Sequence, residues 1–368
     1  VVRARRRSPR ASPTSLTTVG ESDAVTYAAA GVDIEAGDRA VELMRASIAG
    51  ATRPEVVGGF GGFAGLFDAG ALRAFTRPLL ATSTDGVGTK VVIAQRMDVH
   101  DTIGQDLVAM LVDDVVVCGA EPLFVTDYIA CGSVVPERIA AIVSGVAEGC
   151  RIAGAALLGG ETAEHPGLLA PDEYDLAGAT TGVVEADAVL GSHRVADGDA
   201  VVALASSGLH ANGYSLARHV FFTVAGWSLE RTVPELGRTL GEEMLEPTRI
   251  YARDCLALTT AVDVHAMSHI TGGGLAANLD RVLPDGTGAV LDRSTWTLPP
   301  VFDVLHTLGV AEAELERTFN VGVGMAVVLP ASEVDAALTL LRATGMSAWQ
   351  IGTVLRGEQT RVVGAHPG

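Results

Sequence analysis

The spacing of apolar residues divides the chain into alternating helices and strands. Apolar positions that recur every three or four residues predict helices, and short apolar runs bounded by glycine or polar residues predict strands. In the first half these patterns predict helices at 37–49, 102–118 and 136–153, strands at 79–83, 123–130 and 176–184, and a short apolar segment at 155–158. In the second half a strand at 200–204 leads into a helix from Tyr214, and the alternation continues to Val363.

Clusters of glycine, proline and polar residues mark the expected domain boundaries. A turn-rich stretch at 191–198 follows the last strand of the first half, so we expect an N-terminal domain at 26–187 and a C-terminal domain at 188–368. Residues 1–25 are rich in arginine and lack apolar periodicity, which predicts a disordered tail. The fold class is therefore α+β, or mixed α/β, with two domains.

The charge balance limits the classes of partner. Acidic residues outnumber basic residues by 44 to 26, for a net charge of −18, which argues against nucleic acid and anionic membranes. The four cysteines form no C-x-x-C pair, and no apolar run is long enough to span a bilayer, so we expect a cytoplasmic protein. An anionic ligand would need local help from a divalent cation, backbone N–H groups and a few placed cations.

The densest group of reactive side chains follows the strand at 79–83. Asp85 is a carboxylate suited to Mg²⁺, while Gly86, Gly88 and Thr89 offer backbone N–H groups and a hydroxyl to phosphate oxygens. Lys90, the only lysine in the chain, would add a cation to the same phosphates. The alternative is an ordinary glycine turn with a surface lysine.

Three aspartates lie in the apolar helix at 102–118. Asp106 and Asp113 are seven residues apart and share a face, whereas Asp114 lies about 100° round from Asp113. The other positions are so apolar that at least one of these carboxylates must meet the interior, where it needs a partner such as Mg²⁺. Solvated carboxylates are the alternative.

Three further glycine-rich segments are candidate ligand loops. The loop at 58–65, with Gly59, Gly61 and Gly62, suits a flap over a nucleotide, because its context does not fit a dinucleotide-binding fold. The segment at 159–167 carries Glu161, which could bind a metal, act as a base, or stand in a plain loop. The segment at 206–215, with Ser207, Gly208 and Asn212, would leave amides free for a ribose phosphate, unless it is only a helix cap.

With these motifs in place, the sequence resembles the phosphoribosylformylglycinamidine cyclo-ligase family, also called aminoimidazole ribonucleotide synthetase. The resemblance runs from about Tyr27 to Val363. It rests on the segments already described and on further motifs at 30–34, 100–104, 119–124, 247–251, 271–274 and 319–325.

This resemblance implies an activity and an assembly. The activity is an ATP-dependent ring closure, in which the formyl oxygen of formylglycinamidine ribonucleotide is phosphorylated and an amidine nitrogen then displaces phosphate. The assembly is a homodimer whose N-terminal sheets close a β-barrel, with an N-terminal domain for ATP, metal and dimerisation and a C-terminal domain for the substrate.

The resemblance also implies roles for the candidate residues. Asp85 and Asp114 would hold Mg²⁺, and it stays open whether the adjacent Asp113 joins them, since relatives often carry Asn there. The catalytic candidates are Lys90, Glu161, His210 and His269. A thiamine-phosphate kinase and a non-catalytic nucleotide-binding regulator remain as alternative functions.

Overall fold

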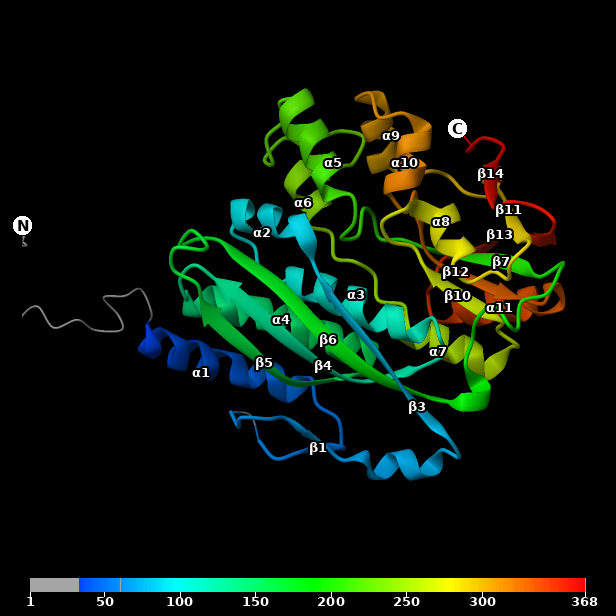
Figure 1. The fold of residues 1–368 in the computed structure, drawn as a ribbon. Helices are drawn as coiled ribbons and strands as arrows, with labels where there is room; N and C mark the ends of the chain where they lie inside the picture. Colours follow the sequence, from blue (N-terminus) through cyan, green and yellow to red (C-terminus); the bar gives the residue numbers. More distant parts are fainter. Residues whose placement is uncertain (1–32, 60, 368) are drawn as a thin grey trace, which may run out of the picture.

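The structure is a computed structural model that describes residues 33–59 and 61–367. The Arg-rich segment that the sequence predicts to be disordered lies outside these residues. Within them the chain forms two larger β-sheets with helices packed against both (Figure 1). The expected mixed α/β architecture is therefore confirmed.

The N-terminal half is built on a four-stranded sheet in the order β3-β6-β4-β5. Its strands are β3 (Pro78–Gly86), β6 (Tyr174–Glu185), β4 (Glu121–Cys131) and β5 (Ala156–Glu164). Neighbours are antiparallel except β4 and β5, which run parallel. The sheet is open in a single chain, with β3 and β5 as its edges.

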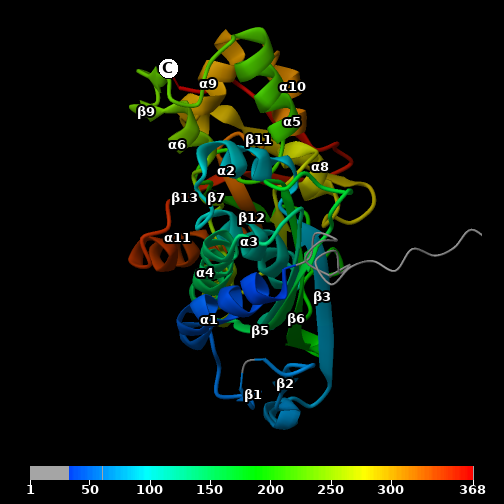
Figure 2. The ribbon, with the colours of Figure 1, turned by 90° about the vertical axis from the view of Figure 1, so that its left-hand side faces the viewer.

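Three helices cover one face of this sheet, namely α1 (Ile34–Gly50), α3 (Ile103–Val116) and α4 (Pro136–Ala153) (Figure 2). Helix α3 lies at the centre and is buried along almost its whole length, as its apolar sequence predicts. Helix α4 begins with Pro136 and is followed by Gly154, whose φ of 82° suits glycine just after a helix C-terminus. These helices match the periodicity of the sequence closely.

Strand β5 corrects one expectation. The sequence predicts a loop for the glycine-rich segment at 159–167, but β5 continues through it to Glu164 and pairs with β4 along its length. Gly160 sits opposite Asp127, whose carboxyl oxygen would lie 1.9 Å from a Cβ at position 160. The glycine thus marks a close approach inside a strand and does not end the strand.

The C-terminal half is built on a six-stranded sheet in the order β10-β12-β7-β13-β11-β14. Its central strands β7 and β12 are almost completely buried. Leu275 and Leu279 of α8 pack with Val201 on one face, whereas α7 and α11 pack on the other face with Val202. The bounds are β7 (Ala200–Ala205), β10 (Ala266–His269), β11 (Thr287–Asp292), β12 (Val323–Leu329), β13 (Ala348–Arg356), β14 (Arg361–Val363), α7 (Ala252–Ala261), α8 (Gly274–Asp280) and α11 (Val334–Ala343).

The remaining strands and α-helices are short. They are β1 (Val56–Val57), β2 (Leu66–Phe67), β8 (Thr232–Val233), β9 (Arg238–Thr239), α2 (Val91–Met97), α5 (Tyr214–Arg218), α6 (Leu240–Met244), α9 (Pro300–Thr307) and α10 (Glu312–Thr318). Helix α5 continues into a π-helical segment at His219–Val224.

The two halves share one interior. A single hydrophobic cluster extends from α3 and α4 into α7 and one face of the C-terminal sheet. In the part of the chain that the structure describes, no helix is long and apolar enough to cross a membrane.

Candidate functional site

The three aspartates of α3 have different surroundings. Asp106 and Asp113 are both completely buried, which confirms that at least one carboxylate of this helix meets the interior. Asp113 accepts hydrogen bonds from the backbone N–H of Tyr251 at 3.0 and 3.2 Å, and burial raises its pKa to about 7. Asp114 is the exposed member, with 42% of its side chain accessible. Of the two adjacent aspartates, only Asp114 can therefore reach a ligand.

Asp114 lies in a cleft between the two halves of the chain. The cleft has a volume of about 280 Å³, and its lining includes Ser83, Ser268, His269 and Arg281. His269 Nδ1 is 2.9 Å from Asp114 Oδ1, and Ser83 Oγ is 3.5 Å from Asp114 Oδ2.

Carboxylates raise the pKa of His269. Burial lowers the pKa of this imidazole, but the hydrogen bond to Asp114 and the charges of Asp113, Asp114 and Asp85 outweigh that effect, so the net shift is upward. The pKa of Asp85 is also raised, by burial and by the charge of Asp114. The site therefore concentrates negative charge that a cation would relieve.

The described residues contain no group of three or more His, Cys, Asp or Glu side chains arranged to hold a metal. Asp85 and Asp114 are a pair, and a pair of carboxylates is the usual protein contribution to Mg²⁺ bound with a nucleotide, because phosphate oxygens and water complete the octahedron. These two residues fit a nucleotide-bound Mg²⁺, whereas the buried Asp113 does not.

Lys90 does not lie where the sequence predicts. Its side chain is completely buried, and Nζ donates hydrogen bonds to Asp106 Oδ1 at 2.7 Å, Glu246 O at 2.6 Å and His210 O at 3.1 Å. An ammonium has three N–H donors, and all three are occupied here. This placement contradicts the expectation that Lys90 binds phosphate, since no donor and no exposed surface are left for a ligand.

The loop at 206–213 contains buried residues, 208–211, whose backbone amides lack an internal partner among the residues described. The N–H groups of residues 208–211 donate to no acceptor within the described ranges 33–59 and 61–367. The carbonyl of Gly208, in contrast, accepts a 2.9 Å hydrogen bond from Asn320. The anion site expected at this loop would depend on these amides alone, because α5 has only five residues.

The buried side chain of His210 makes a hydrogen bond within this loop. Its backbone has φ of 63°, and its Nε2 accepts a 3.1 Å hydrogen bond from the N–H of Ser207. Burial lowers the pKa of His210 well below its ordinary value, so the imidazole is neutral. With 1% exposure, it acts on the loop's shape and is poorly placed as a proton acceptor for substrate.

A second glycine loop, at 271–274, meets the first. A Cβ at Gly272 would lie 3.8 Å from the side-chain oxygen of Asn212. The side-chain nitrogen of Asn212 contacts the sulfur of Met110 in α3. Thr89 from the 83–90 segment lies 3.4 Å from Ser215 through their hydroxyls. The structure therefore brings three sequence-predicted segments together at the boundary between the halves.

The glycine loop at 58–65 is largely exposed in its described part. Gly58 and Gly61 have φ of 90° and 102°, which only glycine adopts readily, and a Cβ at Gly59 or Gly61 would meet no described atom within 4 Å. At its end Gly65 packs against the backbone of Leu158 in β5. This contact places the loop beside a cavity on β5.

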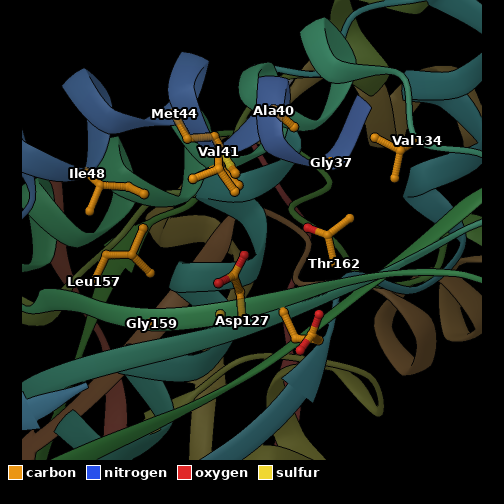
Figure 3. A pocket seen from close by; sticks show the side chains of 13 residues that line it. Gly37, Ala40, Val41, Met44, Ile48, Asp127, Val134, Leu157, Gly159 and Thr162 are labelled. Carbon is orange, nitrogen blue, oxygen red and sulfur yellow. The ribbon is translucent and has the colours of Figure 1, made fainter. Parts of the chain in front are cut away.

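That cavity is a feature that sequence reasoning missed. It has a volume of about 230 Å³ between α1 and the strands β4 and β5, with apolar walls from Val41, Met44 and Leu157. Figure 3 shows the Asp127 carboxyl pointing from the strand toward α1. Glu161 also lines the cavity, whereas the contribution of α1 has no marker in the sequence beyond ordinary amphipathicity.

The buried carboxyl of Asp127 should make the free energy of unfolding decrease as pH rises. Burial raises its pKa to about 7, compared with about 3.9 in an unfolded chain. Between these values the folded state holds a proton that the unfolded state has released, so the free energy of unfolding decreases as pH rises, by up to about 4 kcal/mol. We expect Asp127→Asn to remove this part of the slope in urea unfolding between about pH 4 and 7. Parallel wild-type and variant profiles would contradict the assignment.

Comparison with known proteins gives family matches to both halves. Residues 67–184 match the N-terminal domain, and residues 196–365 the C-terminal domain, of AIR synthase related proteins. The phosphoribosylformylglycinamidine cyclo-ligase of Desulfitobacterium hafniense is 49% identical over 330 residues, covering 89% of this chain and 96% of the relative. The enzyme of that name from Thermosynechococcus vestitus is 52% identical over 334 residues, covering 90% and 96%.

Solved structures with the same fold are more distant in sequence. Thiamine-monophosphate kinase from Stenotrophomonas maltophilia superposes with a TM-score of 0.62 at 20% identity, covering 89% of this chain and 97% of that one. Hydrogenase maturation protein HypE in complex with ATP gives a TM-score of 0.63 at 18% identity, covering 89% and 90%. At this identity the likeness concerns the fold alone.

Proposed function

Because the chain belongs to the phosphoribosylformylglycinamidine cyclo-ligase family, we propose that it converts formylglycinamidine ribonucleotide and ATP into aminoimidazole ribonucleotide, ADP and phosphate in purine synthesis. The observation that carries this proposal is identity of about one half over 96% of the length of relatives with that name. The thiamine-monophosphate kinase, in contrast, shares only 20% of its residues with this chain.

The test is an assay of the purified protein with Mg²⁺, ATP and one acceptor at a time. Formylglycinamidine ribonucleotide should give aminoimidazole ribonucleotide and one ADP per product, whereas thiamine phosphate should give no ADP above background. ADP formation with thiamine phosphate alone would favour the kinase, and no turnover with either would favour a binding protein.

In this proposal Asp85 and Asp114 hold Mg²⁺ bound to the phosphates of ATP. The cation would neutralise charge on the transferring phosphoryl group. The supporting observations are the accessible Asp114 side chain and the raised pKa of Asp85, which reflects repulsion between the two carboxylates as well as burial. The free amides at 208–211 would hold the substrate's ribose phosphate, where the net charge of −18 offers no general attraction.

The cavity beneath α1 suits the adenine of ATP, because it combines apolar walls with a few polar groups. Asp127 and Asp85 both pair with Gly178, so they stand in one row across the sheet, two strand spacings or about 10 Å apart. Leu107 and Leu111 of α3 lie over Gly178 between them. One chain therefore does not connect the cavity directly with Asp85.

A homodimer would bring the cavity beneath α1 of one copy next to Asp85 of the other copy. The edge strands β3 and β5 are unpaired within the described chain, and the sheet face away from the helices exposes Leu80 at 63% and Tyr128 at 41%. Pairing β3 of one copy with β5 of the other would close eight strands into a barrel. It would also set the Glu161 cavity of one copy beside Asp85 and Asp114 of its partner.

Mixed dimers test this arrangement. Asp114→Asn and Glu161→Gln homodimers should each be nearly inactive, whereas co-expressed chains should recover about a quarter of wild-type activity. Half of the dimers would be mixed, and each mixed dimer would carry one intact site. Sites contained within one chain would give no recovery, and sedimentation as a monomer at micromolar concentration would also reject the arrangement.

A further inference from the structure

The buried ammonium of Lys90 joins the two halves of the molecule. Lys90 and Asp106 belong to the N-terminal half, whereas the carbonyls of His210 and Glu246 that accept from Nζ belong to the C-terminal half. Asp106 completes the junction, because its Oδ1 also accepts from the N–H and the hydroxyl of Thr248 at 2.8 and 2.6 Å. One charged pair thus holds two separate segments of the C-terminal half, the loop at 206–213 and the stretch at 246–248.

One of these segments is the loop at 206–213. The carbonyl of Gly208 is held by Asn320, and the carbonyl of His210 is held by Lys90. The carbonyls of Gly208 and His210 are thus held by internal donors, whereas the amides of residues 208–211 find no acceptor in the described chain. His210 makes this contact with Lys90 in a left-handed backbone conformation, with φ of 63°, which is costly for a residue other than glycine and needs support from its surroundings.

We infer that Lys90 is a positioning residue, which fixes the amides at 208–211 in the arrangement that binds the substrate's phosphate. The inference rests on the proposed function and gives Lys90 a role without contact to any phosphate. It also accounts for a single lysine in a chain whose other cations are arginines. A compact ammonium supplies three donors in different directions at a site with no exposure, whereas a planar guanidinium is larger and directs its donors in a fixed fork.

The test separates substrate binding from ATP binding. Lys90→Met keeps a long unbranched side chain and removes all three donors. We expect the KM for formylglycinamidine ribonucleotide to rise about tenfold or more, and the KM for ATP to change less than about twofold. A purely structural role would lower the folded fraction and hence the apparent kcat, but it would leave both KM values unchanged. Lys90→Arg should not restore the substrate KM.

A second variant guards against misfolding. Lys90→Met leaves Asp106 charged and buried, so the double variant with Asp106→Asn removes that charge while retaining an amide at the position. It should fold and show the same selective rise in KM. The matched control is Arg293→Met, because Arg293 also combines carboxylate partners, Glu312 and Glu316, with two backbone carbonyls, Val362 and Gly364. Its loss should leave both KM values within about twofold of wild type.

Calorimetry with ribose 5-phosphate makes the outcome independent of turnover. We expect its Kd to weaken about tenfold in the double variant, even if the proposed reaction were wrong. Equal Kd values in wild type and double variant, or equal rises in both KM values, would overturn the role of Lys90. Failure of the proposed function would instead appear as an inactive wild-type enzyme that still binds ribose 5-phosphate more tightly than the variant.

Discussion

Replacing Asp114 with asparagine is expected to lower kcat/KM by about tenfold or more and to move the Mg²⁺ titration to higher concentration. The change removes a charged oxygen from the only accessible carboxylate of α3, and Mg²⁺ binds charged oxygen ligands preferentially. Asp85→Asn should act in the same direction. Calorimetric Mg²⁺ binding in the presence of ADP provides a readout that does not depend on turnover.

The adjacent Asp113 supplies the control for this prediction. It is buried, and its oxygens accept from the N–H of Tyr251, which an amide oxygen can also do. Asp113→Asn should therefore leave the Mg²⁺ titration midpoint within about twofold of wild type. Wild-type Mg²⁺ curves for both Asp85→Asn and Asp114→Asn would remove the metal assignment, and a shift confined to Asp113→Asn would reverse it.

The second large effect is on stability, from Gly104→Ala. A Cβ at Gly104 would lie 2.2 Å from Val146 N and 2.4 Å from Ile142 O, which are backbone atoms of the neighbouring helix α4. Backbone atoms cannot rotate away as a side chain can, so the two helices must separate. We expect a loss of about 3 kcal/mol or more in the free energy of unfolding, at the upper end of overpacking effects. Urea unfolding measures it.

Gly50→Ala is the matched control. Gly50 is the last residue of α1, and a Cβ there would meet no atom of the described residues within 4 Å. Alanine favours the helix by up to about 1 kcal/mol, so this variant should be as stable as wild type or slightly more stable. A Gly104→Ala protein within about 1 kcal/mol of wild type would show that α3 and α4 are not packed this closely.

Local patterns were sufficient for the elements of the N-terminal half. The expected helix at 136–153 and strand at 176–184 correspond to α4 and β6 within two residues, because each has one buried face and a clear period. For β5, the sequence indicates only the apolar start of the strand, at 155–158. Its glycines indicate a loop by local rules, and the strand pairing that overrides them comes from β4, far along the chain.

Local sequence patterns also reveal only part of the candidate site. The sequence indicates that a carboxylate of α3 is buried, but the residues that satisfy it come from elsewhere. Lys90 meets Asp106 across 16 residues, and it meets the carbonyls of His210 and Glu246 across 120 and 156 residues. No local pattern reports such contacts, so a lysine beside glycines suggested phosphate binding. The free amides of the 206–213 loop, in contrast, follow from small residues near one another in sequence.

Ring closure through a phosphorylated formyl oxygen can be tested directly with an oxygen label. Formylglycinamidine ribonucleotide labelled with ¹⁸O in the formyl group is incubated with the protein, Mg²⁺ and ATP, and the released phosphate is analysed by mass spectrometry. We expect one ¹⁸O atom in each phosphate released, in step with formation of aminoimidazole ribonucleotide and ADP. Unlabelled phosphate, or ring closure without ATP, would contradict it.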